Sequence, residues 1–361
     1  RAFVGETVAV TLSVTNRKLL PLPGLRVDDY LPVELVFTDV TPEASHIPGL
    51  AFIRQHFSLS WFERAARTYH FDCRRRGLYI FPQLRLETGD PFGLFPVQAE
   101  IRQEDRLIIY PQVKPVAGLD LPAKTLFGPA VADRRMLEDP VYLRGVRPYQ
   151  PQDSLRYIHW KATARTDALQ TKMFEPTTAP AVVFLVNVAT FSKSWRGIDP
   201  VLLERVVSVA ASLCAYAVEQ KLMVGLSANG TAYRSDQQLR VLPSRSPQQL
   251  TRLLEALASV RGIASSEFEP FLLRDSSRLP WEATLVVITA VVTPGLEEGL
   301  LRLKDAGRKL VLLSLAETPP RRIRGVLTYH LPGRQQDEAF HFTPVGGAPE
   351  DRPAKPEEAG P

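Results

Sequence analysis

The chain has 361 residues, of which 45% are hydrophobic and 23% charged, so neither a single small scaffold nor wholesale disorder fits it. Lys and Arg outnumber Asp and Glu by 44 to 39, and the resulting net charge of +5 is too weak to indicate a nucleic-acid binder by itself. The 31 prolines favour loops, turns and edge strands over a helical bundle.

The two cysteines, Cys73 and Cys214, are too few for a disulfide framework or a zinc site, and they indicate a reducing compartment. No run of 18 uncharged apolar residues occurs, so we expect no membrane span within this sequence. The chain starts at Arg1 and enters a strand pattern at once. We therefore expect an upstream segment that this sequence lacks.

Residues 1–115 are predicted to form an N-terminal antiparallel β-sandwich-like domain. Residues 8–14 alternate apolar side chains with smaller or polar ones, which is typical of a half-buried strand, and Asn16 ends the pattern. Further short strand candidates, separated by Gly and Pro, are 25–30, 51–60, 67–73, 78–88 and 106–110.

Residues 116–179 are predicted to be a connecting segment, because hydrophobic periodicity is lost there. One short helix is expected within it. Asp153 would cap that helix, and Leu155, Ile158 and Ala162 would lie on its buried face.

Residues 180–344 are predicted to form a doubly wound, Rossmann-like α/β domain. The run Ala181–Val186 is apolar throughout, as in a strand buried on both faces of a parallel sheet. Helix-length and strand-length segments then alternate, with an extra edge strand at 240–242 after an Asn229-Gly230 turn. The helices are expected at 201–220, 247–260 and 295–306, the strands at 222–227, 284–290 and 309–315, and a disordered tail at 345–361.

No catalytic constellation is found, and we predict a protein that is not an enzyme and carries no cofactor. No Gly-Lys pair exists to build a P-loop, and no dinucleotide fingerprint follows Val186. The six histidines lack metal-ligand spacing. Ser227 stands in a near match to a nucleophile elbow, but Asn229 replaces the required glycine, so an ordinary strand-end serine is expected.

The end of the first parallel strand is where an open α/β sheet binds ligands. A von Willebrand A-type domain has an Asp-x-Ser-x-Ser metal motif there, and this chain has Asn187, Ala189 and Phe191 in the three places. Thr190 and Thr289 offer hydroxyl groups nearby. We expect a degenerate, metal-free pocket, with a divalent-cation site as the alternative.

The segment 143–165 concentrates basic and aromatic side chains. Three interpretations stay open: arginines that brace a domain junction, a protein-binding face, and, least favoured, a nucleic-acid site. Trp160→Ala should destabilise the fold if the ring is in the core, whereas Arg147→Ala should leave folding intact if the face is exposed. The candidate residues of this partner-binding or structural signature are Arg147, Tyr149, Asp153, Arg156, His159, Trp160, Lys161 and Arg165.

On these residues the chain resembles the domain-of-unknown-function 58 (DUF58) family. The signature Arg-x-Tyr-x-Pro-x-Asp-x-x-Arg-x-Ile-x-Trp-Lys-Ala-x-Ala-Arg is matched from Arg147 to Arg165, and an Asp-Pro-Phe-Gly-Leu-Phe motif occupies 90–95. Two positions depart from the family pattern: Gln152 stands where Gly is usual, and His159 stands where an acidic residue is usual.

The resemblance implies a von Willebrand A-like C-terminal half and two membrane helices upstream of this chain. It also implies a location on the cytoplasmic face of the bacterial inner membrane and partnership with a MoxR-type AAA+ ATPase. We therefore expect a non-enzymatic, membrane-anchored adaptor that does not bind nucleic acid. The alternatives are a ligand-binding domain in which Thr190 or Thr289 and partner carboxylates hold a divalent metal, and an envelope-linked enzyme of unassigned substrate.

Overall fold

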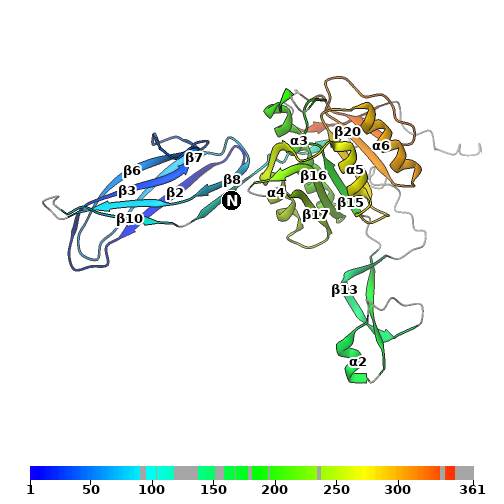
Figure 1. Ribbon diagram of the computed structural model, residues 1–361, viewed down its shortest axis with the longest axis horizontal. Helices are drawn as coiled ribbons and strands as arrows, with labels where there is room; N and C mark the ends of the chain where they lie inside the picture. Colours follow the sequence, from blue (N-terminus) through cyan, green and yellow to red (C-terminus); the bar gives the residue numbers. More distant parts are fainter. Residues whose placement is uncertain are drawn as a thin grey trace, which may run out of the picture.

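The computed structural model describes residues 1–89, 95–102, 104–117, 137–150, 158–166, 168–177, 181–193, 196–233, 237–333 and 338–345. Within these ranges the chain contains several sheets and five helices, which confirms the predicted mixture of β and α/β structure. A region built from strands lies on one side, an α/β region on the other, and a hairpin with a short helix projects away from both (Figure 1).

The β region is built from three sheets, with strand orders β10-β9-β3-β6-β5, β2-β7-β4 and β1-β11-β8. All neighbours are antiparallel except β1 and β11, which are parallel. The strands are β1 (Ala2–Phe3), β2 (Thr7–Thr15), β3 (Leu22–Pro32), β4 (Val36–Phe37), β5 (Glu43–Ala44), β6 (Leu50–Leu59), β7 (Arg64–Asp72), β8 (Gly77–Phe81), β9 (Leu84–Thr88), β10 (Val97–Ile101) and β11 (Asp105–Tyr110).

The core of the β region lies between sheets that face each other. Leu12 and Val14 of β2 pack against Val27 of β3 and Phe57 of β6, so the alternation predicted for residues 8–14 does place one face in the core. The single strand predicted at 78–88 is wrong, because β8 and β9 are separate and belong to different sheets. The break falls at Pro82, which has no N–H to continue a ladder.

A β-hairpin occupies part of the segment predicted to connect the two domains. Strand β13 (Leu137–Pro148) pairs antiparallel with β14 (Gln170–Thr177), and helix α2 (Trp160–Thr166) lies between them in sequence. These strands were not predicted. The register of the pair shifts between Asp139 and Leu143 and again between Leu143 and Gly145, and such bulges interrupt the two-residue period that identifies a strand.

The α/β region is centred on one sheet of order β17-β16-β15-β19-β20-β21-β23. The five strands from β16 to β21 in this order are parallel, and the edge strands β17 and β23 are antiparallel. Its strands are β15 (Ala181–Val186), β16 (Met223–Ala232), β17 (Gln238–Ser244), β19 (Thr284–Thr289), β20 (Leu310–Ser314), β21 (Leu327–His330) and β23 (Thr343–Pro344). Three short strands lie outside this order: β12 (Val116–Ala117) pairs with β22 (Phe340–His341), and β18 (Val260–Ala264) pairs with β16.

Helices cover both faces of this sheet. Val182 and Phe184 of β15 pack in one core with α3 (Pro200–Glu219) and α4 (Gln249–Ser259). Val183 and Leu185 pack in the other with α5 (Phe268–Ser276) and α6 (Pro294–Asp305). The unbroken apolar run of β15 therefore has the predicted cause, burial on both faces.

Helix α3 is the central helix of the α/β core. Asp199 caps it by accepting hydrogen bonds from the backbone N–H groups of Val201 and Leu202. Among the described helices it alone is long and apolar enough to cross a membrane, yet more than half of its apolar stretch is buried inside the molecule. Its hydrophobicity is therefore accounted for by packing against the sheet.

The predicted turn at Asn229-Gly230 is wrong, because β16 continues through both residues to Ala232. A side chain at Gly230 would meet Val188 Cγ1 at 2.8 Å and the carbonyl oxygen of Arg261 at 3.0 Å. Glycine is therefore required here by close packing inside a sheet and not by turn geometry. Helix α5 and strand β21 were also missed.

The β region and the α/β region meet at the end of α4. The buried side chain of Arg76 donates from Nη1 to the carbonyl oxygens of Leu257 (3.0 Å) and Val260 (2.9 Å). Its Nε lies 3.1 Å from Oε2 of Glu204 on α3. A guanidinium from one region thus caps the C-terminal end of a helix in the other, where positive charge is favourable.

Candidate functional site

The carboxyl ends of β15 and β19 lie side by side at the point where the order of the parallel strands reverses. Taken in chain order, the five parallel strands run 2-1-3-4-5 across the sheet, and β15 is strand 1. Open α/β sheets bind ligands at such a reversal. Asn187 directly follows β15 and Thr289 ends β19, so the fold brings these two predicted residues together.

A hydrogen-bonded cluster of neutral side chains fills this position. Asn187 Nδ2 donates to Thr289 Oγ1 at 3.0 Å. Asn187 Oδ1 accepts from the backbone N–H of Ala189 and from Asn229 Nδ2, both at 3.1 Å. Asn229 Oδ1 accepts from the backbone N–H of Val188 at 2.9 Å. The three side chains are buried, and their polar atoms form hydrogen bonds with one another and with the neighbouring backbone.

The hydroxyl groups of Thr289 and Thr190 at this edge also take part in hydrogen bonds within the protein. Thr289 Oγ1 donates to the carbonyl oxygen of Val291 at 2.7 Å and accepts from its N–H at 3.1 Å. Thr190 Oγ1 accepts from the N–H of Asp199 at 2.7 Å, which ties the loop after β15 to the start of α3. Ala189 contributes no oxygen donor from its side chain, and Phe191 is half-buried.

The chemistry of this edge fits a closed structural cluster better than a metal centre. Hard divalent cations prefer anionic oxygen ligands, whereas the oxygens of Asn187, Asn229 and Thr289 are neutral and already accept hydrogen bonds. Across the residues that the structure describes, no group of three or more His, Cys, Asp or Glu side chains could hold a metal ion.

Asn229 was missed as a member of this cluster. The Asn-Gly pair is a strong hairpin signal, and it concealed a residue that lies on a central strand beside Asn187. Strand length gave no signal, because Met223–Ala228 already pair with all six residues of β15. Ser227, on the same strand, is buried and donates to the carbonyl oxygen of Leu239, as expected for a structural serine.

The signature residues that the structure describes lie on the projecting hairpin. Helix α2 starts at Trp160, and the helix start predicted at Asp153 lies outside the described residues. His159 provides the cap: its Nδ1 accepts from the N–H of Ala162 at 3.0 Å. A neutral imidazole nitrogen can accept this bond, which explains how a histidine serves at this position. Two signature residues, Asp153 and Arg156, lie outside the described residues, as does Leu155.

The start of β14 joins α2 to the end of β13. Arg147 and Ile158 both lie opposite Thr171, the former in the β13–β14 ladder and the latter in an isolated bridge. Thr163 Oγ1 accepts from the N–H of Gln170 at 3.0 Å, and the N–H of Tyr149 donates to the carbonyl oxygen of Leu169 at 2.8 Å. Ile158 is buried as predicted, whereas Ala162 is only half-buried.

The outer face of α2 is exposed. Trp160 is 69% exposed, and Lys161 and Arg165 of the same helix are exposed as well. No residue of α2 is buried. The possibility that Trp160 belongs to the core is therefore wrong, and its ring is accessible to a partner. Arg147, on the neighbouring strand, is half-buried and donates from Nη1 to the carbonyl oxygen of Pro148 at 3.1 Å.

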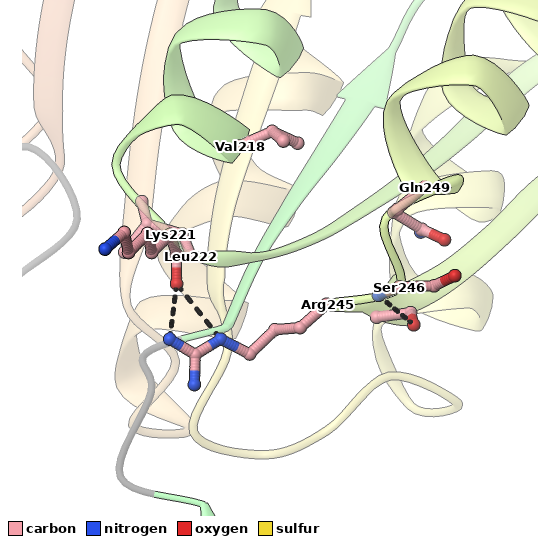
Figure 2. Close-up of a pocket in the computed structure, with 7 residues that line it drawn as sticks. Val218, Lys221, Leu222, Arg245, Ser246 and Gln249 are labelled. Atoms are coloured by element: carbon pink, nitrogen blue, oxygen red, sulfur yellow. Dashed lines mark hydrogen bonds between the residues drawn. The ribbon is translucent and has the colours of Figure 1, made fainter.

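A pocket of about 260 Å³ lies at the opposite edge of the α/β sheet (Figure 2). Its polar groups are largely occupied: Arg245 donates from Nε and Nη2 to the carbonyl oxygen of Lys221, and Gln249 Nε2 donates to the carbonyl oxygen of Val224. None of the predicted site residues lines it. The lining residues are Val218, Lys221, Leu222, Ser244, Arg245, Ser246 and Gln249.

The comparison with protein families matches the hairpin and the α/β region together. The family model described as "Protein of unknown function DUF58" matches residues 145–343, more than half of the chain. This chain belongs to the DUF58 family. The family resemblance drawn from the signature is thereby confirmed, and the matched span begins two residues before Arg147.

A relative of this DUF58 protein is the uncharacterized protein YeaD of Bacillus subtilis strain 168. It is 25% identical over 328 residues, covering 87% of this chain and 72% of YeaD.

Likenesses to solved structures are distant. The GH20 exo-β-N-acetylglucosaminidase of Vibrio harveyi is 10% identical, with a TM-score of 0.24 over 92% of this chain and 77% of the other. The pilus adhesin RrgA of Streptococcus pneumoniae is 10% identical, with a TM-score of 0.19 over 85% and 42% of the two chains. At these TM-scores neither likeness bears on fold or activity.

Proposed function

We propose that this DUF58 protein is a non-enzymatic adaptor that binds protein partners through the outer face of its projecting hairpin. We call this the signature face and define it by Arg147, Trp160, Lys161 and Arg165. The observation that carries the proposal is the exposure of Trp160, 69%, on a helix that buries no residue of its own. Exposing a tryptophan to water is unfavourable unless a partner covers it.

The chemistry of the signature face suits a protein partner. Tryptophan and arginine are enriched among residues that dominate binding energy at protein interfaces. Lys161 and Arg165 are exposed on the same helix, one turn apart from each other, so an acidic surface on the partner would complement their charge. The hairpin also projects from the rest of the molecule, which leaves room for a large partner (Figure 1).

We propose a MoxR-type AAA+ ATPase as this partner, on the strength of the family resemblance. The proposal extends to the upstream membrane helices and to a position on the cytoplasmic face of the inner membrane. For the α/β region we propose a von Willebrand A-like domain without a metal. The strand order 2-1-3-4-5 and the neutral cluster of Asn187, Asn229 and Thr289 support that interpretation.

Site-specific photocrosslinking tests the adaptor proposal. A photoreactive amino acid replaces Trp160 in the full-length membrane-anchored protein, and a matched control carries it at Leu301, which is exposed on α6 of the α/β region. We expect a crosslinked AAA+ ATPase from position 160 and little or none from position 301. Crosslinks to no protein, or equal crosslinking from both positions, would remove the signature face as the binding site.

A further inference from the structure

The end of the β region carries a cluster of exposed apolar side chains, which we call the apolar tip: Leu19, Leu20, Trp61 and Phe62. The first pair lies in the loop between β2 and β3, the second in the turn between β6 and β7. Their exposed fractions range from 63% to 77%. Four large apolar residues on two adjacent loops form a patch, unlike the single exposed leucines that most surfaces carry.

The apolar tip lies at the end of the sandwich farthest from the α/β region. In the β2–β7 ladder, Thr15 pairs with Arg64 at the tip, and Thr7 pairs with Asp72 at the other end. The chain then reaches Arg76, the residue that joins the α/β region. Eight residue steps at about 3.4 Å each separate the two ends by about 27 Å. Figure 1 shows this arrangement, with the end of β2 and the start of β3 on the side away from α3 and α4.

The two loops of the tip are held together by one buried side chain. Asn16 Nδ2 donates to the carbonyl oxygens of Leu20 (2.8 Å) and Ser60 (2.9 Å), and its Oδ1 accepts from the N–H of Lys18 (3.1 Å). In the turn, the N–H of Ser60 donates to Glu63 Oε2 at 2.6 Å. The loops therefore satisfy several of their own backbone groups, which lowers the penalty for removing them from water.

The turn also holds Phe62 in a costly conformation. Its φ is +54°, in the left-handed region that residues other than glycine seldom adopt. Packing of the ring does little to offset this cost, since the ring is exposed. Backbone strain that is not offset by packing contacts of the same residue is a feature of functional loops.

We propose that the apolar tip inserts into the interfacial layer of an anionic membrane. Tryptophan, phenylalanine and leucine are the side chains that favour this layer. Exposed basic side chains surround the tip: Arg17 and Lys18 precede the leucines, and Arg64 follows Phe62. Glu63, the acidic residue between them, is held by the N–H of Ser60. The charge at the tip thus complements a surface of anionic lipid headgroups.

The size and shape of the tip favour a membrane over a second protein. A stable protein interface takes about 20 to 30 residues from each side. The tip consists of two loops at the end of the sandwich and offers four apolar residues, which is enough to anchor a loop among lipid headgroups but small for a specific protein contact. A membrane also needs no complementary hollow. This proposal goes beyond the adaptor function, because it concerns different residues and a different ligand.

Vesicle sedimentation with the 361-residue chain tests the proposal. The vesicles are phosphatidylcholine alone and phosphatidylcholine mixed with phosphatidylglycerol. We expect binding to the mixed vesicles and a blue shift of tryptophan emission on binding. Leu19→Ser/Leu20→Ser and Trp61→Ser should each abolish sedimentation, and the blue shift should be absent in Trp61→Ser.

Matched controls separate the tip from general surface hydrophobicity. Leu242→Ser/Ile263→Ser and Trp281→Ser change residues of the same kinds that are 60% exposed or more but lie in the α/β region, and they should bind like wild type. Arg17→Ala/Lys18→Ala should weaken binding to the mixed vesicles by about 30-fold, since each basic residue near an anionic surface contributes about 1 kcal/mol.

Three results would overturn the membrane proposal. They are absence of vesicle binding by the wild-type chain, equal binding by the tip variants and the α/β controls, and loss of ATPase crosslinking in a tip variant that still binds vesicles. The last result would assign the tip to a protein partner. The first two results leave the signature face untouched, since Trp160 crosslinking tests it separately.

Discussion

Nε of Arg76 lies 3.1 Å from Oε2 of Glu204, which joins the β region to α3 of the α/β region through one ion pair. The same guanidinium caps α4 through Nη1. An arginine outside the signature therefore braces this junction, and the bracing interpretation of the signature arginines stays a prediction.

Arg76→Ala should destabilise the protein by about 1 to 3 kcal/mol, because it removes the buried guanidinium that donates to the helix carbonyls and leaves those carbonyls unsatisfied. Denaturant unfolding monitored by circular dichroism measures the change. Arg75→Ala is the matched control, since Arg75 is the adjacent exposed arginine and should change stability by less than about 0.5 kcal/mol. Equal effects of the two substitutions would contradict the brace.

Trp160→Ala should leave the melting temperature unchanged, because the ring is exposed and its removal opens no cavity. A buried aromatic provides the contrast: Phe184→Ala, in the α/β core, should cost about 3 to 5 kcal/mol. Differential scanning calorimetry of both variants decides the point. A large loss of stability in the Trp160 variant would return the ring to a structural role.

Thr289→Val should destabilise the α/β region by about 1 to 3 kcal/mol, because the isosteric side chain leaves Asn187 Nδ2 without its acceptor in a buried setting. Neither the wild-type chain nor the variant should gain thermal stability from Mg²⁺ or Mn²⁺. Thermal melts with and without the metals test this. A metal-dependent rise in the wild-type melting temperature would favour the cation-site alternative over the neutral cluster.

Asp29 should make the protein less stable as pH rises from about 4 to 6. Burial raises the pKa of this carboxyl from 3.8 to about 6, while the hydroxyl of Tyr69, which donates to Oδ2 at 3.2 Å, opposes the shift and the charge of Asp105 adds to it. The folded state therefore holds the proton more tightly than the unfolded state, and its advantage is lost once the pH exceeds the folded pKa.

Asp29→Asn isolates this contribution. The amide cannot ionise and can still accept from Tyr69, so the variant should be more stable than wild type at pH 7, by up to about 3 kcal/mol for a shift of this size. At pH 4 the advantage should vanish. Urea unfolding of both proteins across this pH range checks the sign, and a variant no more stable than wild type at pH 7 would show that Asp29 carries no such penalty.

The elements that were predictable from sequence are those whose hydrophobic pattern follows directly from the burial of one or both strand faces. The run Ala181–Val186 is apolar because both faces of β15 are buried, and its predicted bounds match the strand. Residues 8–14 alternate because one face of β2 is in the core. The hairpin of β13 and β14 was not predictable in this way, since its bulges break the two-residue period.

The candidate site was predictable only in part, for reasons that concern tertiary contacts. The position of Asn187 and Thr289 followed from the rule that open sheets bind ligands at the carboxyl ends of their strands. Asn229 was missed because the Asn-Gly pair is a turn signal, whereas Gly230 is in fact required by close packing. The motif alone left two places open for Trp160, the core or the surface. Its exposure is a tertiary property: α2, which starts at Trp160 with His159 as its cap, buries none of its residues.

The most direct test of the adaptor account is the affinity of a purified MoxR-type AAA+ ATPase for this protein and for its Trp160→Ala/Lys161→Ala variant, measured by isothermal titration calorimetry. Arg75→Ala serves as the matched control. The account predicts that wild type and control bind equally and that the double variant binds at least about 30-fold more weakly, as expected when an interface loses a dominant aromatic residue. Equal affinity of all three proteins, or no binding by the wild type, would contradict it.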